Sequence, residues 1–152
     1  MSQLEFLKEV LTEDEFSDLE EIMNFSLDPK IDLEILQEKI AFASFHQAKL
    51  TKMMFKIKLM YADLETEFEA WHSAQFHDVA ENFDGFPELL KTPKDYEREI
   101  KKKSEYKATK TLLRKMEQTI SSMQSKEKEL SSFDWKVKGI IDLHKIQHNI
   151  MY

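Results

Sequence analysis

Two pairs of residues that contain histidine have spacings found in metal sites. Glu69 and His72, at i, i+3, share one face of a helix, as the ligands of helical di-iron proteins do. Such sites need a second copy of the motif and two further glutamates, and the chain has one copy. His144 and His148 lie at i, i+4, but no glutamate follows His144 as metalloproteases require, which favours a surface pair. We therefore expect no metal and no cofactor.

Other catalytic patterns are missing from the sequence. The carboxylates of Asp63, Glu65, Glu67 and Glu69 alternate along the chain, which scatters them around a helix instead of converging them as a calcium loop would. Nothing resembles a nucleophile elbow, a P-loop or a Ser-His-Asp arrangement, and the chain contains no cysteine to act as a thiol nucleophile. We expect a protein that is not an enzyme.

A basic and aromatic stripe is the strongest candidate for binding. Lys49, Lys52 and Lys56 follow i, i+3, i+7 spacing, with Phe55 and Leu59 beside them and Lys58 on the far side of Phe55. Single-stranded nucleic acid is bound by such surfaces, because ammonium groups neutralise phosphates and an aromatic ring stacks on a base. The alternative is that Phe55 and Leu59 contact another helix of the bundle or of an oligomer.

Charge is zoned along the chain, although the formal net charge is −7. Residues 1–40 carry a net −9 and residues 63–90 a net −8, whereas residues 41–62 carry +4 and residues 91–152 carry +6. Local basic segments can contact phosphates if the acidic zones are kept away from them. The second basic segment contributes further candidate nucleic-acid-binding residues, namely Lys101, Lys102, Lys103, Lys107, Lys110, Arg114 and Lys115.

Composition restricts the fold class. The chain of 152 residues has two glycines and three prolines, too few for the turns of an all-β protein or for glycine-rich phosphate loops. Without cysteine no disulfide framework forms, and we see neither a secretory leader nor an apolar run long enough to span a membrane. We expect an all-α intracellular protein with no membrane partner.

Capping signals predict where the helices begin. Thr12 followed by Glu15 fits a capping box for a short helix through Phe25, preceded by another through Leu4, Leu7 and Leu11. Asp28 and Pro29 suit the start of a long helix that runs to Trp71, with either a break near Ser44 or packing against partner chains.

A loop over residues 81–87 should separate two long helices. Thr92 and Pro93 suit the start of the second, which runs toward Leu130, and residues 135–150 are again helical. The fold class is thus two long helices with shorter N-terminal and C-terminal helices. The predicted core of the first long helix consists of Phe42, Leu50, Met53, Ile57, Met60, Tyr61, Leu64, Phe68 and Trp71.

A seam with alternating three- and four-residue spacing follows in the C-terminal half, and it suits helix pairing in a multimer. Gly139, inside this segment, predicts the close approach of a neighbouring helix. The predicted oligomerisation residues are Met116, Ile120, Met123, Leu130, Trp135, Val137 and Ile141.

The same C-terminal run, residues 130–146, resembles the UvsY-type recombination mediators of tailed phages. Members of that family carry an aromatic, a β-branched residue and a lysine, then an isoleucine, an acidic, a large apolar and a basic residue. The matching positions are Trp135, Val137, Lys138, Ile141, Asp142, Leu143 and Lys145. A weaker similarity covers residues 28–32 and Phe45-His46.

The resemblance implies a fold and a partner set. It implies that Lys56 and Lys58, followed by Leu59 and Tyr61, match the basic pair tied to DNA binding in the family. In an alternative register, aligned on Trp71, Thr66 and Phe68 occupy those positions. The resemblance also implies a ring-shaped homo-oligomer that loads a RecA-like recombinase onto single-stranded DNA coated by a single-strand binding protein. Residues 28–152 would form the mediator-like domain, and residues 1–27 an acidic helical extension.

Three hypotheses for function follow. The first is a non-enzymatic mediator that binds single-stranded DNA in phage recombination, repair and replication. The second is a protein–protein adaptor or inhibitor, such as a phage anti-host factor that uses the acidic zones and does not bind nucleic acid. The third is a structural component of the virion.

Overall fold

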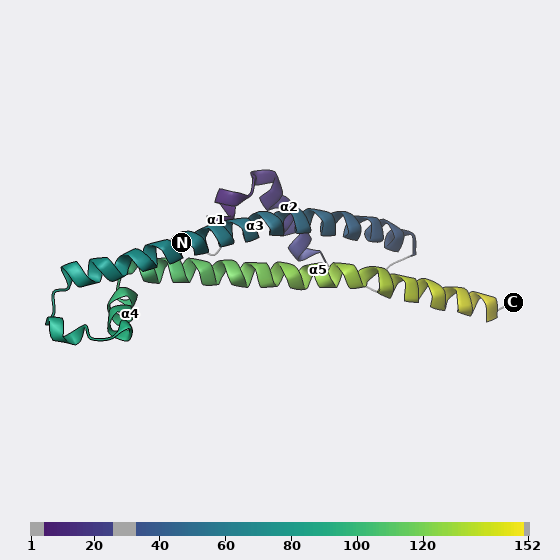
Figure 1. The fold of residues 1–152 in the computed structure, drawn as a ribbon. Coiled ribbons are helices and arrows are strands. Elements are labelled where there is room, and N and C mark those ends of the chain that lie inside the picture. Colours follow the sequence, from purple (N-terminus) through teal and green to yellow (C-terminus); the bar gives the residue numbers. More distant parts are fainter. Residues whose placement is uncertain (1–4, 26–32, 151–152) are drawn as a thin grey trace. The chain divides into compact units, whose positions relative to one another are not determined.

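The chain is helical throughout the part that its computed structural model describes, residues 5–25 and 33–150. The elements are α1 (Glu5–Val10), α2 (Glu13–Asn24), α3 (Leu33–Asn82), the 3-10 helix η1 (Pro87–Leu89), α4 (Pro93–Lys101) and α5 (Ser104–Ile150) (Figure 1). The predicted all-α fold with two long helices and shorter ones is confirmed. The boundary predicted after residue 27 and the start predicted at Asp28 and Pro29 lie outside the described residues.

The chain divides into two compact units, and each is described by itself. Unit 1 comprises Met1–Ile57 and Thr119–Tyr152, and unit 2 comprises Lys58–Gln118. The long helices α3 and α5 each contribute residues to both units.

Unit 1 buries apolar side chains from all four of its helices. α1 and α2 form a helical pair beside α3, and α3 lies alongside the C-terminal part of α5 (Figure 1). The amide of Gln47 on α3 donates a hydrogen bond of 2.7 Å to the hydroxyl of Ser131 on α5. Removing the apolar side chains from water is the main contribution to the stability of unit 1. The largest fully buried side chains of unit 1 are Leu7, Ile22, Leu50, Met53, Ile57 and Met123.

Unit 2 is built from the end of α3, η1, α4 and the beginning of α5. Its buried residues are Phe68 and Val79 on α3, Ile100 on α4, and Leu113 and Met116 on α5. The hydroxyl of Tyr61 on α3 donates a 2.5 Å hydrogen bond to the carboxylate of Glu117 on α5. This bond joins the two long helices within the unit.

The starts of α2 and α4 agree with the local capping signals. α3 ends at Asn82, which is the second residue of the loop predicted over residues 81–87 and lies eleven residues beyond Trp71. α3 has no break near Ser44, since it is continuous from Leu33 to Asn82. α5 is likewise continuous from Ser104 to Ile150, so residues 135–150 continue that helix instead of forming a separate one.

The predicted second long helix is wrong at Lys102 and Lys103, where α4 ends and α5 begins. The backbone N–H of Lys102 donates to the carbonyl of Glu99, and that of Lys103 donates to the carbonyl of Ile100. The Lys103 side chain donates to Gln75 and Asp78 of α3. Ile100 is fully buried beside this turn. Tertiary contacts therefore end α4 without a glycine or proline.

One packing prediction was also wrong. Phe42 is 54% exposed, because it lies about 80° around the helix from Leu50, and the positions nearer the buried face belong to Ala43 and His46. At Gly139 a Cβ atom would meet nothing within 4 Å, so no helix in the described part of this chain approaches it closely, and approach by a helix of a second copy stays a prediction. The other predicted core residues of α3 are buried or half-buried, as expected.

Candidate nucleic-acid interface

The basic stripe of α3 lies in unit 1, and its lysines have different surroundings. Lys52 is exposed, and Phe55, three residues later, is 64% exposed. Both point away from the buried face that carries Leu50 and Ile57. The sequence prediction that Phe55 lies outside the apolar face is confirmed.

The other two lysines of the stripe pair with carboxylates of α2. Nζ of Lys49 lies 2.9 Å from Oδ2 of Asp18, and Nζ of Lys56 lies 2.6 Å from Oε1 of Glu15. All four side chains are partly buried. Lys49 also lies over the ring of Phe45, with its Nζ 4.4 Å from the ring centroid, which is a cation–π distance.

The local structure of α2 holds Glu15 in place for this pairing. Thr12 is the N-cap, and its hydroxyl accepts a 3.2 Å hydrogen bond from the Glu15 N–H, while the Glu15 carboxylate accepts from the Thr12 N–H. The hydrogen bond from Lys56, together with those from Thr12, lowers the pKa of Glu15 below its ordinary value, against the smaller opposing effect of burial. Glu15 is therefore a preorganised anion that faces the α3 stripe.

Lys58 is the first residue of unit 2 and is exposed on α3. Its side chain is accessible to a ligand, and its role in DNA binding stays a prediction. Leu59, the next residue, is also exposed.

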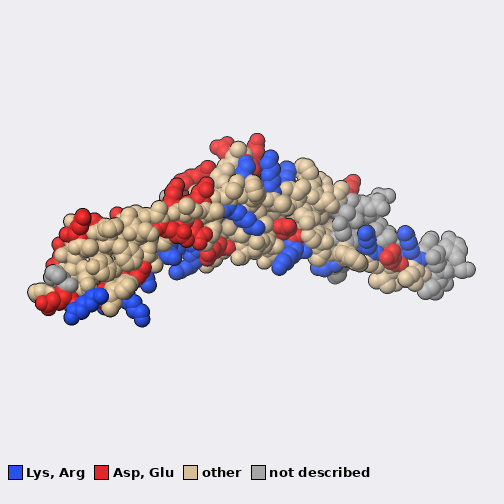
Figure 2. All heavy atoms as spheres, in the orientation of Figure 1, with Lys and Arg blue, Asp and Glu red and all other residues tan. Residues whose placement is uncertain are grey.

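The second basic segment lies in unit 2, on α4, the turn after it and the start of α5. Lys101, Lys107, Lys110 and Arg114 are exposed, and Lys115 is half-buried. Figure 2 shows basic side chains along the α4 and α5 edge of this unit, with acidic side chains over the α3 edge.

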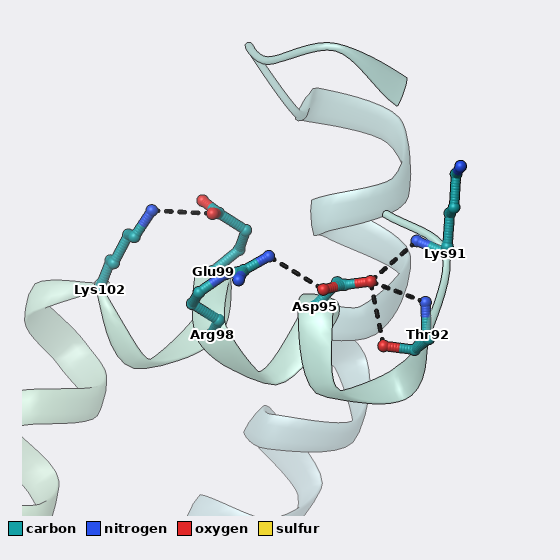
Figure 3. Close-up of polar contacts among 6 residues, drawn as sticks. All are labelled: Lys91, Thr92, Asp95, Arg98, Glu99 and Lys102. Carbon is teal, nitrogen blue, oxygen red and sulfur yellow. Dashed lines mark hydrogen bonds and ion pairs between the residues drawn. The ribbon is translucent and has the colours of Figure 1, made fainter. Parts of the chain in front are cut away.

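Some cations of this segment have local partners. Lys102 pairs with Glu99 one turn earlier at 2.8 Å, and Arg98 pairs with Asp95 at 2.9 Å (Figure 3). Lys103 pairs with Asp78 of α3 and is mostly buried. Lys103 is thus less available to a ligand than the exposed cations of this segment.

An aromatic hollow of unit 2 was missed by the sequence reasoning. The Phe68 and Tyr106 ring centroids lie 5.5 Å apart, and Nζ of Lys110 lies 5.1 Å from the Phe68 ring centroid. Phe68 and His72 share an i, i+4 spacing, but nothing in the sequence places Tyr106 beside them. The residues that line this open hollow are Phe68, Glu69, His72, Ser73, Glu97, Lys101, Tyr106 and Lys110.

The two candidate metal-binding pairs, Glu69 with His72 and His144 with His148, lie on α3 and α5. His72 Nε2 lies 3.0 Å from an oxygen of Glu97 on α4, so its contact in the structure is with a neighbouring helix and not with Glu69. Within residues 5–25 and 33–150 no three metal-ligating side chains gather in one place. His144 and His148 lie in α5, but their side chains are outside what the structure describes.

The predicted oligomerisation residues divide into two groups. Met116, Met123 and Leu130 are buried within the single chain, and Ile120 is half-buried, so part of the seam packs against the chain's own helices. Trp135 is 81% exposed. Val137 and Ile141 lie on α5, with side chains outside the described residues. Assembly into an oligomer stays a prediction.

Comparison with protein-family models, with curated proteins and with solved structures finds no match to this chain. In the part of the chain that the structure describes, no helix combines the length and apolar character needed to cross a membrane. Fold and site together define an all-α protein with separate basic surfaces in its two units.

Proposed function

We propose that the chain is a non-enzymatic mediator of DNA recombination, repair and replication. It binds single-stranded DNA and helps to load a RecA-like recombinase onto strands covered by a single-strand binding protein, acting as a homo-oligomer. The observation that carries this proposal is the exposure of Lys52 together with Phe55 on α3, because a cation beside a free aromatic ring suits a phosphate and its base. The C-terminal family resemblance gives the mediator role.

The exposed cations of unit 2 support the same function. Lys101, Lys107, Lys110 and Arg114 add sites for phosphates that do not depend on the α3 stripe. Weak sites repeated over the copies of an oligomer raise the total affinity without a strong site in any one chain.

Fluorescence anisotropy with a labelled oligonucleotide, over a salt series, tests the proposal. We expect the wild-type chain to bind in low salt and to weaken as salt rises. The double variant Lys52→Ala/Phe55→Ala should bind about tenfold or more weakly, since stacking on one ring contributes about 1–3 kcal/mol per base. The matched control Phe86→Ala/Lys94→Ala removes an exposed ring and an exposed lysine of unit 2 and should bind as wild type does. Absence of wild-type binding in low salt contradicts the proposal.

A second candidate, a protein–protein adaptor or inhibitor without nucleic-acid binding, is favoured by one observation. Asp63, Glu65, Glu67 and Glu69 are all exposed on α3 in unit 2, with no basic residue in their zone of the sequence. A purified partner whose binding survives nuclease treatment, is unchanged by Lys52→Ala/Phe55→Ala and is lost in Asp63→Asn/Glu65→Gln/Glu67→Gln would establish this function instead.

A further inference from the structure

We propose that α2 is a built-in competitor of single-stranded DNA. Its Glu15 and Asp18 occupy the ammonium groups of Lys56 and Lys49, so a strand reaches the whole α3 stripe only after it has displaced α2. This inference rests on the proposed function, and it identifies α2 as the element that controls access of single-stranded DNA to the α3 stripe.

The pairing is specific in geometry. Glu15 and Asp18 are about one turn apart on α2, and they contact lysines about two turns apart on α3, at 2.6 and 2.9 Å. The earlier carboxylate meets the later lysine, so the two helices are matched in opposite directions. Two ion pairs at fixed positions set the register of α2 along the stripe.

α2 is also seated by apolar contacts. Leu19 and Ile22 are buried on this helix, and Ile22 is completely inaccessible to solvent. The carboxylate of Glu15 is held by the Thr12 capping box and needs little ordering to meet Lys56. α2 is therefore a folded part of unit 1, and its ion pairs with Lys56 and Lys49 are supported by buried apolar contacts of the same helix.

The charge of α2 makes it a mimic of a phosphate backbone. The helix Glu13–Asn24 carries six acidic residues and no basic one. Carboxylates and phosphates are both oxyanions that accept charge-assisted hydrogen bonds from lysine, so one ammonium group cannot serve both fully. The remaining acidic residues also repel an approaching strand from Lys52 and Phe55.

The test compares two isosteric double variants in the full chain. Glu15→Gln/Asp18→Asn removes both ion pairs but keeps the side-chain shapes. Glu13→Gln/Glu20→Gln makes the same charge change on the same helix, at positions that pair with no lysine in the part of the chain that the structure describes. Anisotropy with a labelled oligonucleotide in low salt gives the affinity of each, and circular dichroism checks that each is folded.

We expect Glu15→Gln/Asp18→Asn to bind about three- to tenfold more tightly than wild type, as the loss of two competing ion pairs predicts, and the control to change by less than about twofold. Equal gains in both variants would mean a general charge effect and would overturn the competition. Equal affinity in all three proteins would leave the proposed function standing and remove the inference. If none of them binds, the proposed function fails and the inference with it.

Hydrogen exchange of the wild-type chain gives a second, independent measurement. Saturation with the oligonucleotide should lower the protection of the α2 amides while that of α4 in unit 2 is kept. An α2 that stays as protected in the complex as in the free protein would overturn the competition, because the strand would then be bound without displacing it.

Discussion

The two basic regions differ in the origin of their counterions. On α3 in unit 1, Lys49 and Lys56 pair with carboxylates 31 and 41 residues away in the sequence, on another helix. On α4 and the turn after it in unit 2, Arg98 and Lys102 pair with carboxylates three residues away (Figure 3). Lys103 is the exception in this region, because it pairs with Asp78 on α3. The partner of a local pair lies one turn away in the same segment of the chain, whereas the partners of Lys49 and Lys56 lie on a second helix, α2. Similar runs of lysine therefore differ in how accessible they are to a phosphate.

Truncation of one buried isoleucine in each unit tests whether the units respond separately. Ile22 on α2 and Ile100 on α4 are both completely buried. We expect Ile22→Ala or Ile100→Ala to lower the free energy of unfolding by about 2–5 kcal/mol, through lost transfer energy and a cavity. Hydrogen exchange should localise the loss of protection to α2 in the first variant and to α4 in the second. Loss of protection spread evenly over both units would show that they do not respond separately.

Removal of the two N-caps compares the starts of α2 and α4. Thr12→Ala removes the hydroxyl that accepts from the Glu15 N–H, and we expect a loss of about 1 kcal/mol in urea denaturation. Thr92→Ala should cost less, because Asp95 keeps its hydrogen bonds from the backbone N–H groups of Lys91 and Thr92 (Figure 3). By loosening α2, Thr12→Ala should also tighten DNA binding slightly, and Thr92→Ala should not. A larger effect from Thr92→Ala would contradict this comparison.

Lowering the pH should reduce the stability of unit 1 because of His46. This residue is buried among the rings of Phe25, Phe42 and Phe45, and its Nδ1 has no hydrogen-bond partner among the described residues. Burial lowers the pKa of His46 below its ordinary value of 6.5; Lys49 adds to this effect, and the carboxylates of Glu21 and Asp18 oppose it.

The sign of the pH dependence follows from that direction. Above about pH 6.5 the imidazole is neutral in both folded and unfolded chains, so its contribution to stability is fully present. As the pH falls below 6.5 toward the lower folded pKa, the unfolded chain binds the proton first and stability is lost. Urea denaturation at pH 7 and pH 5 should show this loss in wild type and in His77→Gln, a control at an exposed position, and a smaller one in His46→Leu. An unchanged pH dependence in His46→Leu would exclude this histidine as the cause.

Local signals in the sequence predicted the starts of two helices. Thr12 with Glu15, and Thr92 with Pro93, place the starts of α2 and α4, because capping depends on residues within one turn. The end of α4 depends instead on Lys103 reaching Gln75 and Asp78, residues that no local pattern brings near it. Helical periodicity placed most of the buried face of α3 for a similar reason, since the face is set by spacing alone.

The candidate site was less predictable than the fold. The spacing of Lys49, Lys52 and Lys56 shows that they share a side of α3, but periodicity does not say which helix packs beside that side. Asp18 and Glu15 therefore could not be recognised as their partners. The aromatic hollow of unit 2 was not predicted for the same reason, because Tyr106 on α5 contacts Phe68 on α3 and periodicity within one helix does not show contacts between helices.

The smallest expected effect concerns Tyr61 in unit 2. Its hydrogen bond to Glu117 joins two helices of that unit, as the Glu15–Lys56 pair joins two helices of unit 1. The same hydrogen bond, with smaller contributions from burial and from the charges of Glu117 and Glu65, raises the pKa of Tyr61 to about 12. Tyr61→Phe removes one bond between α3 and α5, so we expect a loss of about 0.5–1.5 kcal/mol in the free energy of unfolding. Glu117→Gln keeps an acceptor at this position but removes its charge, so the pKa of Tyr61, followed by ultraviolet titration of the phenolate, should fall toward the ordinary value of 10. A Tyr61 that titrates near 10 in the wild-type chain would mean that this bond is not formed in solution, and α3 and α5 would then be held in unit 2 by their apolar contacts.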